Sequence, residues 1–111
     1  MYSGPNAAWA YKNIISPETY SRVVLLGPTH RLQFRALGMT GCTVWETPIG
    51  DLEIDLEGIE KLYKIFKEKD LGNLIGLLPV RAEEDEHSLE MHCPYIRKVF
   101  PNVKLLPITV G

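Results

Sequence analysis

The residues best suited to chemistry lie in an acidic, histidine-containing run at positions 81–95. Four consecutive acids at positions 83–86 precede His87, and Glu90 and His92 follow in a segment with helical spacing. Negative charge at the N-terminus of a helix contributes about 0.3–1 kcal/mol per well-placed group, so helix stabilisation accounts for the acids. It does not account for the imidazoles. His87 and His92 are therefore the candidate acid–base residues of the run.

The spacing of the two histidines limits how they can act together. They are five positions apart, so on a straight helix they would not share a face. If His87 lies in the loop before the helix, its side chain is able to turn toward a pocket. Glu86 and Glu90 are four positions apart, and they share a face only if the helix already includes Glu86.

Pro94 predicts a distortion in the same helix. Proline lacks an N–H, so the carbonyl of Glu90 loses its usual partner four residues on. With Ser88 as the N-cap, Pro94 lies beyond the first turn, and a kink is expected near Glu90. The unpaired carbonyl could serve a polar pocket, or the bend could simply let the helix follow the sheet. The residues alone leave both readings open.

A second candidate site follows the most apolar stretch of the chain. Residues 22–26 are short, apolar and rich in β-branched side chains, which is typical of a strand buried on both faces. The loop Gly27–His30 would leave the carboxyl end of that strand, where open α/β sheets bind their ligands. His30 is thus a candidate ligand for iron, copper or zinc, a general base, or a polar loop residue with a backbone partner. We expect the fold to bring this loop and the acidic run together around a pocket.

The elements that must position these groups predict an α/β fold with an incomplete mixed sheet and flanking helices. A helix followed by a buried strand implies parallel pairing. A hairpin is expected at 42–55, with its turn at 48–51 and its arms at a sheet edge, because Pro48 cannot donate a ladder hydrogen bond. Helices are expected at 3–15, 56–69 and 88–100, and further strands at 77–80 and 104–110, the last weakened by Pro107.

Apolar stripes on two of these helices predict the core. They consist of Ile59, Leu62, Tyr63 and Phe66 in one helix and Leu89, Cys93, Ile96 and Phe100 in the other. Asp55 is the expected N-cap of the first helix, whose lysines are expected to face solvent. Cys93 reads as a buried small side chain, because cysteine is among the most buried residue types. Trp9 and Trp45 are expected to pack in the core or at its edge.

Composition and charge exclude several classes of function. A formal charge of -2 over 111 residues provides no basic face, so nucleic acid is not an expected partner. No apolar run approaches the roughly 18 residues that span a membrane, and the first residues lack the basic and apolar regions of a secretory signal. Cys42 and Cys93, without CxxC spacing, indicate a reducing compartment and buried thiols, so a cytoplasmic location is expected.

Several blocks of the sequence together resemble the Memo family, which is named for mediating receptor-driven cell motility. The most specific block is EDEHSLEMHCPY at 84–95. The others, in the same order as in the family, are YSG with AA-x-AY at 2–11, LGPTH at 26–30, TP with DL-x-ID at 47–55, and P-x-x-VG at 107–111. The resemblance spans nearly the whole chain. It departs from the family pattern at Cys93, where an aliphatic residue is common.

The resemblance implies a fold similar to that of class III non-haem iron extradiol dioxygenases. The family's metal site combines a histidine from a Pro-His-Ala-Gly-Tyr segment, the histidine of the Gly-Pro-Ser/Thr-His segment and a distant cysteine. Only the second is present here, as His30, and neither Cys42 nor Cys93 matches the third. Residues 1–111 are therefore expected to form a partial Memo-like domain that lacks its N-terminal and C-terminal parts. Iron or copper is the implied cofactor of the full-length parent, and tight binding is not expected here.

The resemblance further implies a cytosolic protein of cell-motility or redox signalling with a metal-capable pocket, and phosphorylated receptor peptides or signalling proteins as partners. His30 would be a metal ligand. The side chains that would line or orient the pocket are Thr29, Glu86, His87, Glu90 and His92. A metal-dependent oxygenase-type enzyme, with His87 or His92 as its acid–base residue, is the alternative. A truncated product without independent activity is a third reading.

Overall fold

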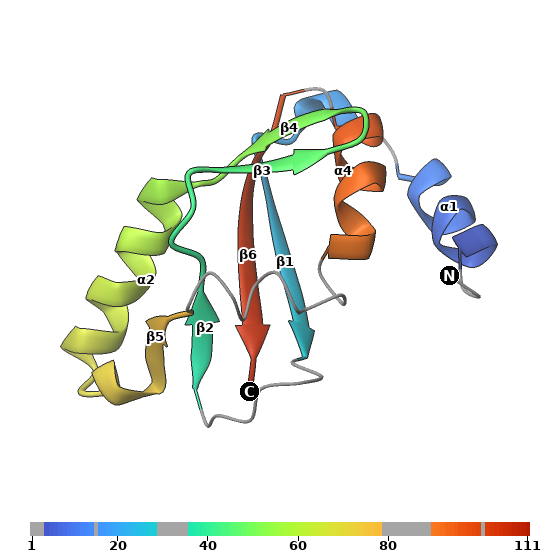
Figure 1. The fold of residues 1–111 in the computed structure, drawn as a ribbon. Helices are drawn as coiled ribbons and strands as arrows, with labels where there is room; N and C mark the ends of the chain where they lie inside the picture. Colours follow the sequence, from blue (N-terminus) through green and yellow to red (C-terminus); the bar gives the residue numbers. More distant parts are fainter. Residues whose placement is uncertain (1–3, 15, 29–35, 79–89, 101) are drawn as a thin grey trace.

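The structure, a computed structural model, describes residues 4–14, 16–28, 36–78, 90–100 and 102–111. In this part of the chain a four-stranded sheet and a two-stranded hairpin lie among α-helices (Figure 1), which confirms the predicted α/β class with a mixed sheet. The helices are α1 (Gly4–Lys12), α2 (Leu56–Glu68) and α4 (Cys93–Val99), with 3-10 turns η1 (Pro17–Thr19), η2 (Gly72–Leu74) and η3 (Glu90–His92). The strands are β1 (Arg22–Pro28), β2 (Leu37–Met39), β3 (Val44–Thr47), β4 (Gly50–Glu53), β5 (Ile75–Leu77) and β6 (Lys104–Val110).

Strand β6 lies inside the main sheet, whose order is β1-β6-β2-β5. β1 and β6 run parallel, from the pair Arg22 and Lys104 to the pair Pro28 and Val110. The parallel pairing predicted from the helix-then-strand order is therefore confirmed. β2 pairs antiparallel with β6 and parallel with β5, which makes the sheet mixed.

Pro107 is fully buried within this interior strand, a position from which proline is normally excluded. The carbonyl of Leu105 accepts a hydrogen bond from the backbone N–H of Asp55 at 2.7 Å, on the edge of β6 that faces away from β1. Backbone polar groups alternate between the two edges of a strand, so Pro107 faces the same edge as Leu105. β2 pairs with β6 only from Ile108 onward. The missing N–H of Pro107 therefore falls between these contacts, and β6 continues without interruption.

Strand β1 differs from the prediction of a strand buried on both faces. Its burial alternates, and Val24 and Leu26 are 52% and 63% exposed. In the described part of the chain β1 has β6 as its only strand neighbour and lies at the edge of the sheet. An edge strand with one open face buries only every second side chain, so the apolar run reflects a strand with an uncovered face.

Helix α2 forms as the sequence predicts. The side chain of Asp55 accepts a hydrogen bond from the backbone N–H of Gly58 at 3.1 Å and caps the first turn. Ile59 is buried, and the other three residues of the predicted stripe pack against the core. The lysines of α2, at positions 61, 64 and 67, are exposed.

The hairpin is confirmed, with a tighter turn than predicted. Thr47 pairs with Gly50, so Pro48 and Ile49 alone form the turn. Gly50 has a φ of +136°, a conformation that glycine adopts without steric penalty. The hairpin forms its own sheet and joins the main sheet through the bridge between Ile54 and Leu105, so its arms are not edge strands of that sheet. A strand runs from Ile75 to Leu77, and of the strand expected at 77–80, residues 79 and 80 lie outside the described residues.

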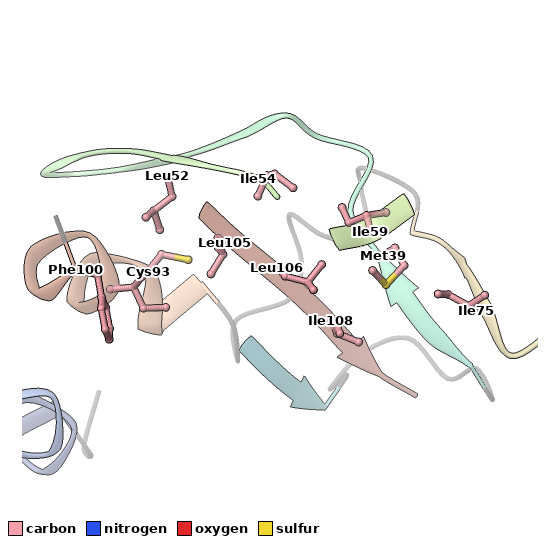
Figure 2. Packing of buried hydrophobic residues seen from close by; sticks show 11 residues of the cluster. Met39, Leu52, Ile54, Ile59, Ile75, Cys93, Phe100, Leu105, Leu106 and Ile108 are labelled. Carbon is pink, nitrogen blue, oxygen red and sulfur yellow. The ribbon is translucent and has the colours of Figure 1, made fainter. Parts of the chain in front are cut away.

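The core lies between the main sheet, the hairpin and the two helices α2 and α4 (Figure 2). Its buried residues are Met39, Leu52, Ile54, Ile59, Ile75, Cys93, Ile96, Phe100, Leu105, Leu106 and Ile108. The core roles predicted for Cys93, Ile96 and Phe100 are confirmed, whereas Leu89 lies outside the described residues. Trp45 packs on the core as expected. Trp9 does not, because its ring is 66% exposed and lies under Lys12 Nζ, 5.2 Å from the ring centroid.

Gly38 allows two segments to approach closely, and replacing it with alanine should destabilise the protein. A Cβ there would lie 2.6 Å from Cγ of Leu78, whose backbone N–H donates to the carbonyl of Met39 at 2.8 Å. Overpacking of this kind costs about 1–3 kcal/mol. Gly76, its partner across β2 and β5, is a matched control, because a Cβ there would meet no atom within 4 Å. Urea unfolding of both variants checks this, and equal losses would contradict the close-packing argument.

Candidate functional site

The segment that carries His92 begins differently from the predicted helix. Residues Glu90–His92 form a 3-10 turn, and the α-helix begins only at Cys93. Pro94 therefore lies in the first turn of α4, where an N–H has no intrahelical acceptor to lose. The predicted kink caused by Pro94 inside a longer helix is wrong, because the helix starts too late for Pro94 to interrupt it.

His92 is held by a residue from the other end of the chain. The hydroxyl of Tyr11, in α1, lies 2.9 Å from Nδ1 of His92. The two rings are tilted at 52° with centroids 5.9 Å apart. Tyr95, in α4, stacks on Tyr11 with centroids 5.2 Å apart and an interplanar angle of 6°. These three side chains, the Tyr11–His92–Tyr95 cluster, join α1 to the start of α4.

The sequence did not indicate a site role for Tyr11. The sequence placed it only within the helix expected at 3–15. Tyr11 and His92 are 81 positions apart, and no local pattern connects residues at such a separation. The one signal was that both belong to blocks shared with the Memo family.

The environment of Tyr11 keeps its hydroxyl protonated. Burial raises the pKa of Tyr11 above its ordinary value, and the neighbouring Cys93 and Tyr95 raise it further. Burial disfavours the phenolate because a negative charge is poorly solvated away from water, and the acidic groups of Cys93 and Tyr95 disfavour it by repulsion. The hydroxyl is therefore available as a hydrogen-bond donor through the neutral and mildly alkaline range.

Cys93 belongs to the core rather than to a reactive site. Its side chain is 3% exposed and packs in the buried cluster, which agrees with the prediction of a small buried side chain. Cys42 is partly exposed, and no disulfide joins the two cysteines.

Most of the other predicted site residues lie outside the described residues. They are Thr29, His30, Glu86 and His87. Glu90 is placed by its backbone at the start of η3. Among the residues that the structure does describe, no group of three or more His, Cys, Asp or Glu side chains could hold a metal ion. The predicted meeting of the Gly27–His30 loop and the acidic run around a pocket stays a prediction.

The described backbone does show where the two segments start. Strand β1 ends at Pro28, so Thr29 and His30 directly follow its carboxyl end. α4 runs opposite to β6, and its first turn points toward the end of the sheet at which β1 and β6 finish (Figure 1).

A second polar cluster is structural. Asp55 is 3% exposed, caps α2 through Gly58, and pairs its carboxylate with the guanidinium of Arg22 in β1. Its own backbone N–H donates to Leu105 in β6. Asp55 thus connects the hairpin, helix α2 and strands β1 and β6 through its side chain and its backbone N–H. Its partners in these contacts are all groups of the protein itself.

Comparison with known proteins agrees with the family resemblance of the sequence. A family model described as "Memo-like protein" matches residues 1–111. The "Protein memo-1 homolog" of Caenorhabditis elegans is 36% identical over 112 residues, which cover 99% of this chain and 30% of that protein. "Protein MEMO1" is 34% identical in Danio rerio and 32% in Homo sapiens, each over 114 residues, 99% of this chain and 36% of the relative.

The mixed α/β fold and the family match over residues 1–111 together define an α/β protein with a Memo-like fold. The chain belongs to the Memo family. It spans about a third of the length of the curated relatives that it matches. None of the helices in the described residues is long and apolar enough to cross a membrane.

Proposed function

We propose that this chain is part of a Memo-like cytoplasmic protein of motility or redox signalling that uses a metal-capable pocket. The observation that carries the proposal is positional. His30 follows the carboxyl end of β1, the edge at which α/β sheets bind ligands, and the family match includes that segment. The first turn of α4, with His92, points toward the same end of the sheet (Figure 1).

In this proposal the residues have separate roles. His30 is a metal ligand, since a neutral imidazole binds iron, copper and zinc well. Thr29, Glu86, His87 and Glu90 line or orient the pocket. Hydrogen bonds from such neighbours orient a ligand and tune its basicity. His92 adds an imidazole whose Nδ1 is already engaged by Tyr11.

The family resemblance assigns one metal ligand, His30, to this chain. Catalytic metal sites in proteins use about three protein ligands, and the described residues contain no such group. A chain that supplies His30 alone provides one point of attachment, and the remaining ligands of the family site belong to segments that this sequence does not contain.

Titration with iron or copper should accordingly show weak binding or none. A single imidazole leaves most of the coordination sphere to water, so the bound state gains little over the hydrated ion. Isothermal calorimetry on the 111-residue chain and on His30→Ala checks this expectation. A sub-micromolar affinity that disappears in His30→Ala would overturn it, because this chain would then hold the metal with the ligands it has.

The alternative is a metal-dependent oxygenase-type enzyme, in which His87 or His92 is the acid–base residue. Catechol ring-opening assays on the full-length parent separate the two functions. Turnover abolished by His87→Ala supports the enzyme. Binding of phosphorylated receptor peptides without turnover supports the signalling protein. Absence of both from the 111-residue chain, with both present in the parent, identifies this chain as a product without independent activity.

A further inference from the structure

We infer that Tyr11 is a positioning residue that holds His92 as the neutral tautomer with its proton on Nε2, so that His92 meets a ligand as a hydrogen-bond donor. The tautomer follows from the geometry of the Tyr11–His92–Tyr95 cluster. The consequence for a ligand rests on the function proposed above, in which the start of α4 faces the pocket.

The proton between Tyr11 and His92 is carried by the Tyr11 hydroxyl. The Tyr11 hydroxyl and Nδ1 of His92 are 2.9 Å apart, within the usual range of a hydrogen bond. In a neutral imidazole one ring nitrogen donates and the other accepts. Among the described residues, Nδ1 is the only hydrogen-bond partner of this hydroxyl, so a proton on Nδ1 would take from the phenolic O–H the one acceptor that these residues offer it. The satisfied arrangement has Tyr11 donating and Nδ1 accepting.

The Tyr11 hydroxyl keeps both its position and its proton. Stacking on Tyr95, with centroids 5.2 Å apart, restricts the ring of Tyr11. The raised pKa of Tyr11 keeps the donor protonated. A hydrogen-bond partner on one ring nitrogen of a histidine fixes whether the other nitrogen carries the proton. The contact between α1 and α4 therefore sets the tautomer of His92.

The hydrogen bond from Tyr11 limits the chemistry that is open to His92. With Nδ1 accepting from Tyr11, a neutral ring must carry its proton on Nε2. Nε2 then has no lone pair for a metal ion and cannot take a proton from a substrate. It can donate a hydrogen bond to an oxygen anion, such as a carboxylate or a phenolate. The geometry therefore favours a hydrogen-bond donor role for His92 over the acid–base role that the alternative enzyme function would give it.

Nitrogen NMR of the histidine-labelled chain tests the assignment. Two-bond couplings between ring protons and ring nitrogens distinguish the two neutral tautomers and the cation. At pH 7.5 His92 should show a non-protonated Nδ1 and a protonated Nε2. Tyr11→Phe, which keeps the ring that stacks on Tyr95, should shift the spectrum of His92 toward a mixture of tautomers. Tyr20→Phe is the matched control, because the Tyr20 ring packs on Phe100 instead, and it should leave the spectrum unchanged.

The wild-type spectrum decides the inference even if Tyr11→Phe fails to fold. A protonated Nδ1 in the wild type overturns it, as does an unchanged spectrum in a folded Tyr11→Phe variant. Addition of zinc to the same sample separates this inference from the proposed function. Zinc should leave the two ring nitrogens of His92 unshifted, and a zinc-dependent loss of its Nε2 proton signal would contradict the donor role. Whether His30 shifts with zinc reports on the metal proposal alone.

Discussion

Replacing Asp55 with alanine is expected to lower the free energy of unfolding by about 2–3 kcal/mol. The change removes the cap on the Gly58 N–H, a loss of about 0.5–2 kcal/mol at a helix N-terminus. It also removes the buried carboxylate that pairs with Arg22. Arg22 is 42% exposed, so water solvates the remaining charge and this part of the loss is well below that of a fully buried pair.

Urea unfolding followed by tryptophan fluorescence measures the effect of Asp55→Ala. Asp51→Ala is the control, because Asp51 is an exposed residue of β4 just before the same junction, and exposed substitutions usually change stability by about 0.5 kcal/mol or less. Asp55→Asn should fall between the two, since asparagine caps a helix about as well as aspartate but carries no charge. Equal losses in Asp51→Ala and Asp55→Ala would show that Asp55 does not connect the elements as described.

Leu105→Ala is expected to destabilise the protein by about 3–4 kcal/mol. Leu105 has no exposed surface and lies in the interior strand β6. Truncation removes buried methyl groups and leaves a cavity that the surrounding sheet and helices fill only partly. Its register partner in β1 is Val23, and its other neighbour is Ile54 at the end of the hairpin. The cavity would thus open at the point where the two sheets meet.

The control for Leu105→Ala is Val24→Ala, one position along the neighbouring strand from Val23. Val24 is 52% exposed, so its truncation should cost less than about 1 kcal/mol. Chemical unfolding of both variants gives the comparison, with the slope against urea reporting any change in the surface exposed on unfolding. A loss in Val24→Ala as large as that in Leu105→Ala would mean that the open face of β1 is covered in solution.

The elements with local signals were predictable from the sequence. α2 has a capping aspartate, a stripe at helical spacing and exposed lysines, and all three act within a few residues of each other. The hairpin was predictable for the same reason, because a turn and two short flanking strands all lie within residues 42–55. In both cases the interactions that decide the structure are close in sequence, and sequence patterns report such interactions well.

Features that depend on distant neighbours were predicted less well. The apolar composition of β1 did not distinguish a covered strand from one with an open face, since coverage depends on which elements lie against it. Pro94 was expected to kink a helix, but its effect depends on where the helix begins. Pro107 was expected to weaken β6, but a gap between Asp55 and β2 on one edge accommodates it.

The sequence by itself determined the family, the α/β class and the candidate histidines, because each of these is encoded in residue types and short spacings. Only the tertiary structure decided what His92 can do. Its partner Tyr11 comes from a helix 81 positions away, and a hydrogen bond between such distant residues forms only when the sheet and the helices pack α1 against α4. The sequence therefore identified His92 as a candidate site residue, whereas the fold sets which of its ring nitrogens carries the proton.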